Sequence, residues 1–322
     1  MSAPPPTVPT LRLGISSCLL GEEVRYDGGH KNDAFVRGLL EPFVAWIPVC
    51  PEVEVGMGVP REAVHLEGEL SAPRMVGSRS GTDWSQAMRR WARRRVEELS
   101  AADLDGYLLK RGSPSCGLHR VKVFVGGMPR PEGRGLFAAE LARALPLLPL
   151  EEEGRLRDPA LRERFVAAAF AHRRFKDALA ADPTPGGLVA FHTGYKLTIM
   201  AHSPEHYRAM GRLVADSGTL PWGELTGSYA RLLAEALAVP ARRGRHVNTL
   251  QHLAGFLKRR LSAADKEELG TVIESYRRGQ VPLVVPLTLL RHHFRHAETP
   301  AWVHRQIYLD PYPAELMLRN EI

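Results

Sequence analysis

The sequence predicts an α/β domain, built on a parallel sheet with helices on both faces, followed by an all-α helical bundle domain. Short apolar runs alternate with helical patterns from residue 11 to about 145, which is typical of parallel strands joined by helices. Beyond residue 159 almost every segment has the apolar period of a helix. With 322 residues, the chain is also long enough for two domains of ordinary size.

The N-terminal half contains four apolar runs of strand length. We expect strands at 11–17, 44–49, 105–110 and 121–126. Helices are expected at 32–43, 83–103 and 133–146. Residues 50–81 contain glycine and proline and are expected to be irregular. The alternation indicates a Rossmann-like parallel sheet.

The C-terminal half is predicted to be helical throughout. The expected helices are 159–181, 185–201, 203–216, 222–238, 246–260, 262–279, 284–297 and 300–308. Ser203 precedes Pro204, which is an N-cap followed by proline at the first helical position, and Ser262 precedes a first turn with acidic residues.

These elements divide the chain into four parts. We expect a disordered leader at 1–10, an α/β domain at 11–148, a linker at 149–158 and an all-α domain at 159–322.

Composition indicates a soluble globular protein, with 44% apolar and 25% charged residues. No stretch approaches the roughly 18 apolar residues of a membrane span, and no secretory signal is visible at the N-terminus. Three cysteines without such a signal argue against a disulfide framework. We therefore expect a cytoplasmic protein without membrane contact.

The net charge of +7 is concentrated in the C-terminal half, because residues 241–308 contain 12 basic and 5 acidic side chains. Such a patch attracts polyanions and favours a nucleic-acid partner. Most of the basic residues are arginine, a bias that heat adaptation or GC-rich coding also explains.

Each cysteine follows an apolar run of strand type. Cys18 ends LGISSC, Cys50 ends FVAWIPVC and Cys116 ends GYLLKRGSPSC. Because parallel strands bring their carboxyl ends to one crevice, the three thiols can converge. Three thiolates can hold a soft metal or a cluster and leave one coordination position open. Zinc with His30 or His119 as fourth ligand, or a catalytic Cys116–His119 pair, are alternatives.

A carboxylate follows the second cysteine closely. Glu52 lies two residues after Cys50 and could act as a general acid or base. Its plain alternative is a loop carboxylate bound to Arg61 or to the backbone. Glu54 is a less favoured substitute for the same chemical role.

Polar residues also surround the other two cysteines. Ser113, Ser115 and Lys110 precede Cys116 and could hydrogen-bond a substrate or a cluster sulfur, with a local turn as the alternative for the serines. The glycine-rich loop after Cys18 contains candidates for substrate contact, with a plain turn as their alternative. These are Arg25, Tyr26 and Asp27.

Three segments together resemble the signature of the thiouracil desulfidase (TudS) family: SSCLLGEEVRYDGGHK, CPEVEVGMGVPRE and KRGSPSCG. This likeness covers roughly residues 10–150. The segment FHTGYKLTIMAHSPEHYRAMGRLVA, at 191–215, resembles the YbgA-like domain that often follows. The two-domain arrangement is similar to that of tRNA 4-thiouridine desulfidases (RudS-type).

The resemblance implies a [4Fe–4S] cluster held by Cys18, Cys50 and Cys116, with one open iron that binds a thiocarbonyl sulfur. Glu52 matches the family's catalytic glutamate. The catalytic serine falls within SPSCG, where Ser113 is favoured over Ser115. The implied reaction is hydrolytic and converts 4-thiouridine in tRNA to uridine, with release of hydrosulfide.

Basic residues of the helical domain are the candidates for contact with RNA, where cations hold phosphates and aromatic rings stack on bases. They are Lys196, Arg242, Arg243, Arg245, Lys258, Arg259, Arg260, Arg291 and Arg295. The plain alternative is a solvated face or a helix–helix interface. His202 and His206, four residues apart, are a further candidate metal pair.

Two other functions stay open. One is a desulfidase of free thiouracil or thionucleosides, in which the helical domain serves dimerisation or stability. The other is a non-enzymatic iron–sulfur protein that binds nucleic acid or senses redox state. The expected partners are thus thiolated tRNA or small thiopyrimidines, and the oligomeric state is open.

Overall fold

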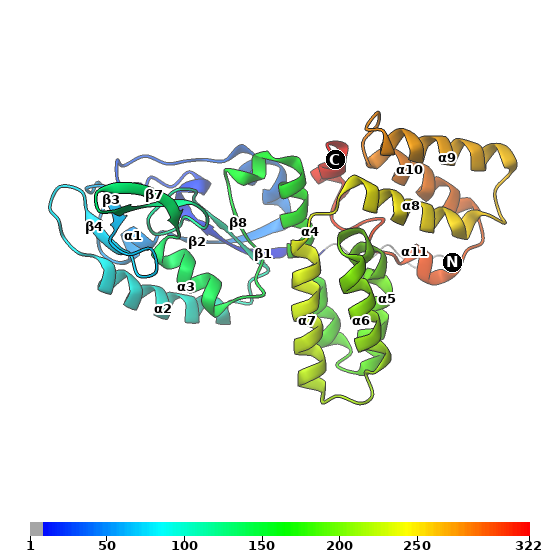
Figure 1. Cartoon of the computed structure of the whole chain (residues 1–322), viewed down its shortest axis with the longest axis horizontal. Coiled ribbons are helices and arrows are strands. Elements are labelled where there is room, and N and C mark those ends of the chain that lie inside the picture. The colour runs from blue at the N-terminus through cyan, green and yellow to red at the C-terminus, as the bar shows by residue number, and fades with distance from the viewer. Residues whose placement is uncertain (1–8) are drawn as a thin grey trace. The chain divides into compact units, whose positions relative to one another are not determined.

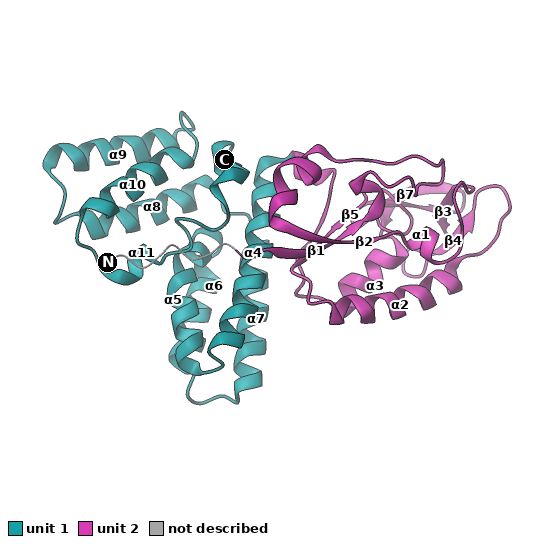
Figure 2. Ribbon diagram, turned by 180° about the vertical axis from the view of Figure 1, so that it is seen from behind, with its two compact units in different colours: residues 1–8, 158–322 teal, residues 9–157 magenta. Residues whose placement is uncertain are grey.

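The computed structural model describes residues 9–322, so residues 1–8 of the expected leader lie outside the described residues. The described chain divides into two compact units, residues 9–157 and 158–322 (Figure 2). In this described part, no helix is long and apolar enough to cross a membrane.

A four-stranded parallel sheet forms the centre of the first unit (Figure 1). Its strands are β1 (Leu11–Ser16), β2 (Val44–Val49), β5 (Gly106–Leu109) and β8 (Leu150–Glu152). Three of them were expected. The fourth, β8, lies in the stretch 149–158 that we predicted to be a linker, and its pairing with β5 makes this stretch part of the first unit.

The strand order is β2-β1-β5-β8, so the chain runs from β1 to β2 in one direction and then back past β1 to β5. In open α/β sheets this reversal creates a crevice at the carboxyl ends of the two central strands. Right-handed crossovers place the two connections on opposite faces of the sheet. Pro48 is tolerated because β2 is an edge strand.

Two of the expected helices are confirmed, as α2 (Ser85–Ala101) and α3 (Leu136–Ala144). They pack against each other beside the sheet, where the rings of Trp91 and Phe137 lie 5.5 Å apart. The segment predicted to be helical at 32–43 is helical from residue 34 on, but it is not a regular α-helix. It forms a six-residue π-helix, η2 (Phe35–Leu40), followed by a short 3-10 helix, η3 (Glu41–Phe43), in whose first turn Pro42 lies.

A second sheet corrects two further predictions. Residues 50–81 contain α1 (Pro51–Glu54), β3 (Val64–Glu67) and β4 (Arg74–Gly77), so this stretch is more regular than predicted. The predicted strand 121–126 forms β6 (Val121–Val125), which belongs to this mixed sheet of order β4-β3-β6-β7 and not to the parallel sheet. The last strand, β7 (Met128–Gly133), returns through Gly126 and Gly127, whose positive φ values permit a tight hairpin.

The second unit is helical, as predicted. Its helices are α4 (Pro159–Ala181), α5 (Pro185–His202), α6 (Pro204–Ala215), α7 (Trp222–Ala238), α8 (Arg243–Leu257), α9 (Ala263–Arg277), α10 (Val284–His296) and α11 (Ala301–His304). Both predicted caps are present: the Ser203 hydroxyl accepts the amide of His206 at 3.3 Å, and Ser262 forms a capping box with Asp265. The last helix ends at His304, four residues before its predicted end.

Two of the buried histidines of this unit contact tyrosine hydroxyls. Nδ1 of His192 lies 3.1 Å from the Tyr229 hydroxyl, and Nδ1 of His246 lies 2.8 Å from the Tyr308 hydroxyl. Burial lowers the pKa of His192 to about 4 and that of His246 to about 3. Both rings are therefore neutral at physiological pH.

Candidate active site

The three cysteines line one cavity of about 380 Å³ in the first unit. Cys18 lies in the short turn η1 (Ser17–Leu20) that follows β1, and Cys50 is the N-cap of α1 directly after β2. Cys116 comes from the longer loop that follows β5. The carboxyl ends of the parallel strands thus bring the thiols together, although 32 and 66 residues separate them in sequence.

Burial dominates the protonation of these thiols. It raises the pKa of Cys18 to about 12 and also raises the pKa values of Cys50 and, further, of Cys116. The charge of neighbouring Cys50 adds to the rise at Cys18, while Lys110 opposes it. Ionised thiols at this depth need a compensating positive group, and a soft metal or cluster supplies one.

A [4Fe–4S] group fits the chemistry and the size of this site. Three sulfur donors face one cavity that is much larger than a single ion. No group of three His, Cys, Asp or Glu side chains in residues 9–322 is gathered tightly enough for one ion. The described cavity lining contains no histidine, so neither His30 nor His119 stands among the thiols.

Glu52 lies in the first turn of α1 and lines the same cavity. Its Oε2 accepts hydrogen bonds from Arg61 Nε at 3.1 Å and Nη2 at 2.5 Å. Arg61 Nη1 also donates to the carbonyls of Val24 and Gly58, both at 3.0 Å. Glu52 is therefore bound to Arg61, as the alternative interpretation predicted, but only one of its two carboxylate oxygens takes part.

The other oxygen of Glu52 faces the two serines. Ser115 Oγ donates to Glu52 Oε1 at 2.6 Å, and Ser113 Oγ lies 3.3 Å from the same atom. The two hydroxyls are 2.8 Å apart. Ser113 Oγ also accepts the amides of Ser115 and Cys116, at 3.2 and 3.1 Å. Ser113 thus fixes the cysteine loop, while Ser115 is the closer partner of the carboxylate.

Two glutamates that sequence analysis missed anchor this loop. Glu153 accepts Lys110 Nζ and the Arg111 amide, each at 2.6 Å, and Glu152 accepts the Leu118 amide at 2.8 Å. Glu152 ends β8 and Glu153 follows it, within the acidic run that we predicted to be linker. An acidic run directly after the apolar stretch LPLLPL was the available signal.

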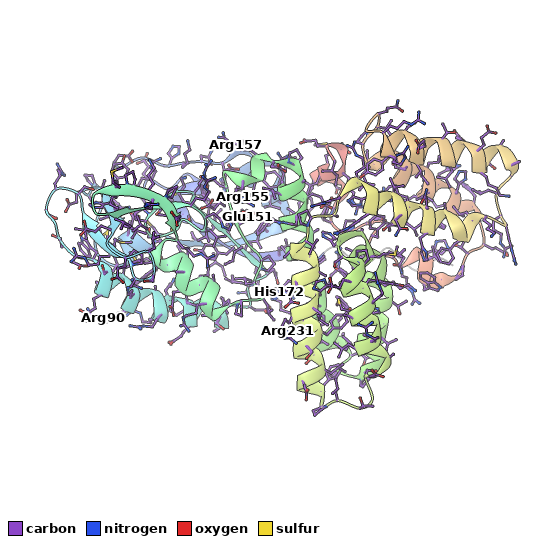
Figure 3. The ribbon with its side chains drawn as sticks, in the orientation of Figure 1. Arg90, Glu151, Arg155, Arg157, His172 and Arg231 are labelled. Atoms are coloured by element: carbon purple, nitrogen blue, oxygen red, sulfur yellow. The ribbon has the colours of Figure 1, made fainter. Side chains whose placement is uncertain are left out.

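The remaining glutamate of the run, Glu151, pairs instead with Arg155 at 2.7 Å (Figure 3). Glu54, the less favoured acid or base, pairs with Arg95 at 3.2 Å and accepts the Cys50 amide. Neither carboxylate is among the described residues that line the cavity.

The candidates for substrate contact are divided. Arg25, Tyr26 and Lys110 line the cavity, whereas Asp27 does not. Asp27 accepts the Gly29 amide at 3.1 Å and pairs with Arg25 at 3.5 Å, so its position is that of the plain turn. Lys31 also lines the cavity and was missed.

The predicted RNA-binding residues of the helical unit fall into two groups. Arg245 donates to the carbonyl of His202, Arg291 pairs with Asp310 at 2.8 Å, and the Lys196 ammonium lies 3.6 Å from the centre of the Trp302 ring. These three are engaged internally. The exposed members are Arg242, Arg243, Lys258, Arg259, Arg260 and Arg295.

The histidine pair does not form a metal site. His202 is buried with Nδ1 at 2.8 Å from the Val239 carbonyl, which leaves it directed into the unit. His206 instead lies 3.5 Å from a carboxylate oxygen of Glu235. The expected i, i+4 spacing does not hold, because His202 ends α5 and His206 lies in α6, with Ser203 between the two helices.

Comparison with known proteins gives two family matches. The family described as 2-thiouracil desulfurase matches residues 13–153, and a protein family of unknown function, DUF1722, matches residues 196–313. These ranges correspond to the first unit and to most of the helical unit.

Two curated bacterial proteins are similar to this chain. Uncharacterized protein YbgA of Escherichia coli (strain K12) is 33% identical over 140 residues, which are 42% of this chain and 81% of that protein. Uncharacterized protein YbbK of Bacillus subtilis (strain 168) is 29% identical over 135 residues, which are 40% of this chain and 89% of that protein.

One solved structure is also similar. It is that of a [4Fe–4S]-dependent thiouracil desulfidase, TudS, with 30% sequence identity and a TM-score of 0.38. The match covers 46% of this chain and 94% of that one.

Proposed function

We propose that this chain, which belongs to the 2-thiouracil desulfurase family and has a DUF1722 region behind that domain, is an iron–sulfur enzyme that converts 4-thiouridine in tRNA to uridine. The observation that carries the proposal is that one cavity contains three thiols, a carboxylate and two hydroxyls that hydrogen-bond to that carboxylate.

Cys18, Cys50 and Cys116 would hold the cluster, because they are the sulfur donors of the cavity. When bound, a [4Fe–4S] cluster with three thiolate ligands supplies Lewis acidity toward a thiocarbonyl sulfur at its open iron. The thiols lose their protons when they bind iron, so loading is favoured as pH rises.

Glu52 is the proton-transfer group of the proposal. Arg61 fixes Oε2, so the carboxylate presents Oε1 to the two serine hydroxyls and to the cavity. In that position Oε1 takes a proton from the attacking water, with the Ser113–Ser115 pair as the hydrogen-bonded path for the proton. Water adds its oxygen at C4 and the C–S bond breaks. Sulfur leaves as hydrosulfide with the second proton of the water, and Glu52 releases the first proton to solvent. The exchange requires no oxidant or reductant.

The exposed cations of the helical unit support RNA as the substrate. Lys258, Arg259 and Arg260 follow one another at the end of α8 and are all exposed. Three adjacent cations release counterions when they contact phosphates, and the binding they provide weakens as salt rises.

The test compares the iron-loaded wild-type protein with its Glu52→Gln variant on tRNA that contains 4-thiouridine. We expect hydrosulfide release and conversion of 4-thiouridine to uridine by the wild type alone, at equal iron content. Absence of both products with a fully loaded wild type contradicts the proposal. It would then favour a non-enzymatic iron–sulfur role.

The size of the cavity supports a second candidate, desulfuration of free thiouracil or thionucleosides. A volume of about 380 Å³ accepts a single nucleobase with its sugar without any RNA. Replacing Lys258, Arg259 and Arg260 by glutamine separates the two candidates. A large, salt-dependent rise of KM for tRNA with unchanged nucleoside turnover favours RNA, and no change on either substrate favours the small molecule.

A further inference from the structure

A second cavity of about 470 Å³ adjoins the cavity of the thiols. The two cavities share Arg61 and Val64 in their walls. The other residues of the second cavity are Met57, Glu62, Arg79, Ser80 and Trp84. The second cavity therefore lies directly beside a molecule that is bound at Glu52 in the cavity of the thiols, with Arg61 in the wall between them.

Arg79 is held at this cavity by a fixed loop. The Glu62 carboxylate accepts the amides of Arg79 and Ser80, at 2.8 and 3.0 Å, as well as the Ser80 hydroxyl. These hydrogen bonds, with that of the Ser80 hydroxyl first, lower the pKa of Glu62 to about 2. Both oxygens of Glu62 are thereby occupied by the loop.

Arg79 is exposed and its guanidinium forms no ion pair or hydrogen bond with a side chain of residues 9–322, although its charge acts on the neighbouring carboxylate of Glu62. An exposed cation on a fixed loop, at the mouth of a cavity, is suited to a phosphate. Arg61, by contrast, is already bound to Glu52 and to two carbonyls.

The wall of the cavity provides an aromatic surface. Trp84 is half-buried, packs against the core beside α2 and lines the cavity. Its backbone amide donates to the Met75 carbonyl at 2.8 Å, which fixes the residue. A held indole is a favourable platform for a nucleobase, because every base has a face that can stack.

We propose that the second cavity binds the nucleotide next to the thiolated one in an RNA strand, with its base against Trp84 and its phosphate at Arg79. The inference rests on the proposed function. It makes the enzyme sensitive to the neighbour of the reacting base, and it assigns Trp84 and Arg79 to substrate binding and not to chemistry.

The experiment measures kcat/KM for the iron-loaded full chain and for Arg79→Gln and Trp84→Leu. The first two substrates are 4-thiouridine as a nucleoside and an RNA trinucleotide with 4-thiouridine in the centre. Two further trinucleotides each carry one abasic residue, either before or after the 4-thiouridine. We expect each variant to lose about tenfold on the trinucleotide, as for loss of one stacked base, and nothing on the nucleoside. One of the two abasic substrates should already show that loss with the wild type.

Arg90→Gln is the matched control, since Arg90 is exposed on α2, the helix that begins directly after Trp84 (Figure 3), and the charge change is equal. Equal losses on nucleoside and trinucleotide, or no loss on either, overturn the inference. Because Trp84 also packs on the core, Arg79→Gln decides the matter if Trp84→Leu folds poorly. Absence of hydrosulfide from tRNA that contains 4-thiouridine, with the iron-loaded wild type, is the separate result that defeats the proposed function itself.

Discussion

Oε1 of Glu52 lies 2.6 Å from the hydroxyl of Ser115, on the side of the carboxylate that Arg61 does not occupy. The carboxylate thus has one oxygen that fixes its position and one that meets exchangeable hydroxyl protons. Within this one side chain, Oε2 holds the carboxylate in position through Arg61, and Oε1 remains available for proton transfer.

Replacement of Glu52 by glutamine keeps the shape of the side chain and removes the proton acceptor. We expect turnover to fall by roughly 100-fold or more while iron content stays at the wild-type level. Glu54→Gln is the control, because Glu54 is in the same turn and pairs with Arg95 instead. Comparable activity of the two variants would remove Glu52 from the proton transfer.

The two serines should differ in what they affect. Ser115→Ala removes the 2.6 Å hydrogen bond to Glu52, so we expect lower turnover with normal iron. Ser113→Ala also removes the acceptor of two loop amides, which costs about 1–2 kcal/mol of loop stability and should loosen Cys116. Turnover and iron content, measured for both variants, distinguish the two roles. Full iron retention with lost turnover in Ser113→Ala would instead support Ser113 as the catalytic serine.

Arg61→Met should destabilise the first unit, because it leaves the carboxylate of Glu52 largely buried without its cation. The two side chains are 5% and 13% exposed, and removal of one partner of such a pair costs about 3 kcal/mol. Urea unfolding followed by tryptophan fluorescence measures this. Addition of Glu52→Gln to Arg61→Met should recover part of the loss, and a double variant as unstable as the single one would contradict the expectation.

Each of Cys18→Ala, Cys50→Ala and Cys116→Ala should lose the cluster. Anaerobic reconstitution followed by iron and sulfide analysis should give about four irons per wild-type chain and far fewer in each variant. His119→Ala is the matched control, since His119 is not among the described residues that line the cavity. Full iron retention in any cysteine variant would exclude that cysteine as a ligand.

The helical unit should lose stability in mild acid. The pKa of His246 is lowered from 6.5 to about 3, so the unfolded chain takes up a proton there before the folded chain does. The stability contribution of the neutral ring is complete above pH 6.5 and is lost as pH falls toward 3, with a loss on the order of 2 kcal/mol near pH 4.5.

Urea unfolding at neutral and acid pH, followed by circular dichroism, checks this expectation. His246→Gln keeps a partner for the Tyr308 hydroxyl and removes the titrating group, so its stability should depend less on pH. An unchanged pH dependence in that variant would assign the acid sensitivity to other groups, with His192 as the next candidate.

Much of the fold followed from apolar periodicity. The strands β1, β2 and β5 and the long helices are strong local patterns, and the placement of the cysteines at strand ends followed from them. The strands β3, β4 and β8 were missed because each has only three or four residues and carries charged side chains. Their stability comes from pairing with distant strands, which local sequence does not reveal.

The candidate site was predictable in its residues and less so in their contacts. Glu52 and Arg61 lie nine residues apart, so their pairing could be foreseen as an alternative. Glu152 and Glu153 reach loops more than 30 residues away, and no local pattern indicates that. Likewise, the run that contains Arg291 and Arg295 does not tell which one turns inward to Asp310.

The anchoring of the Cys116 loop by Glu152 and Glu153 sets an order of assembly during synthesis. A chain emerging from the ribosome presents Cys18 and Cys50 first, but the two carboxylates that anchor the loop with the third thiol are made only with the last strand of its unit and the residue after it. Cluster insertion on a nascent chain would therefore begin only as the first helix of the next unit is being translated. An unfinished chain that lacks this strand would lack both of the carboxylates that hold the loop of Cys116.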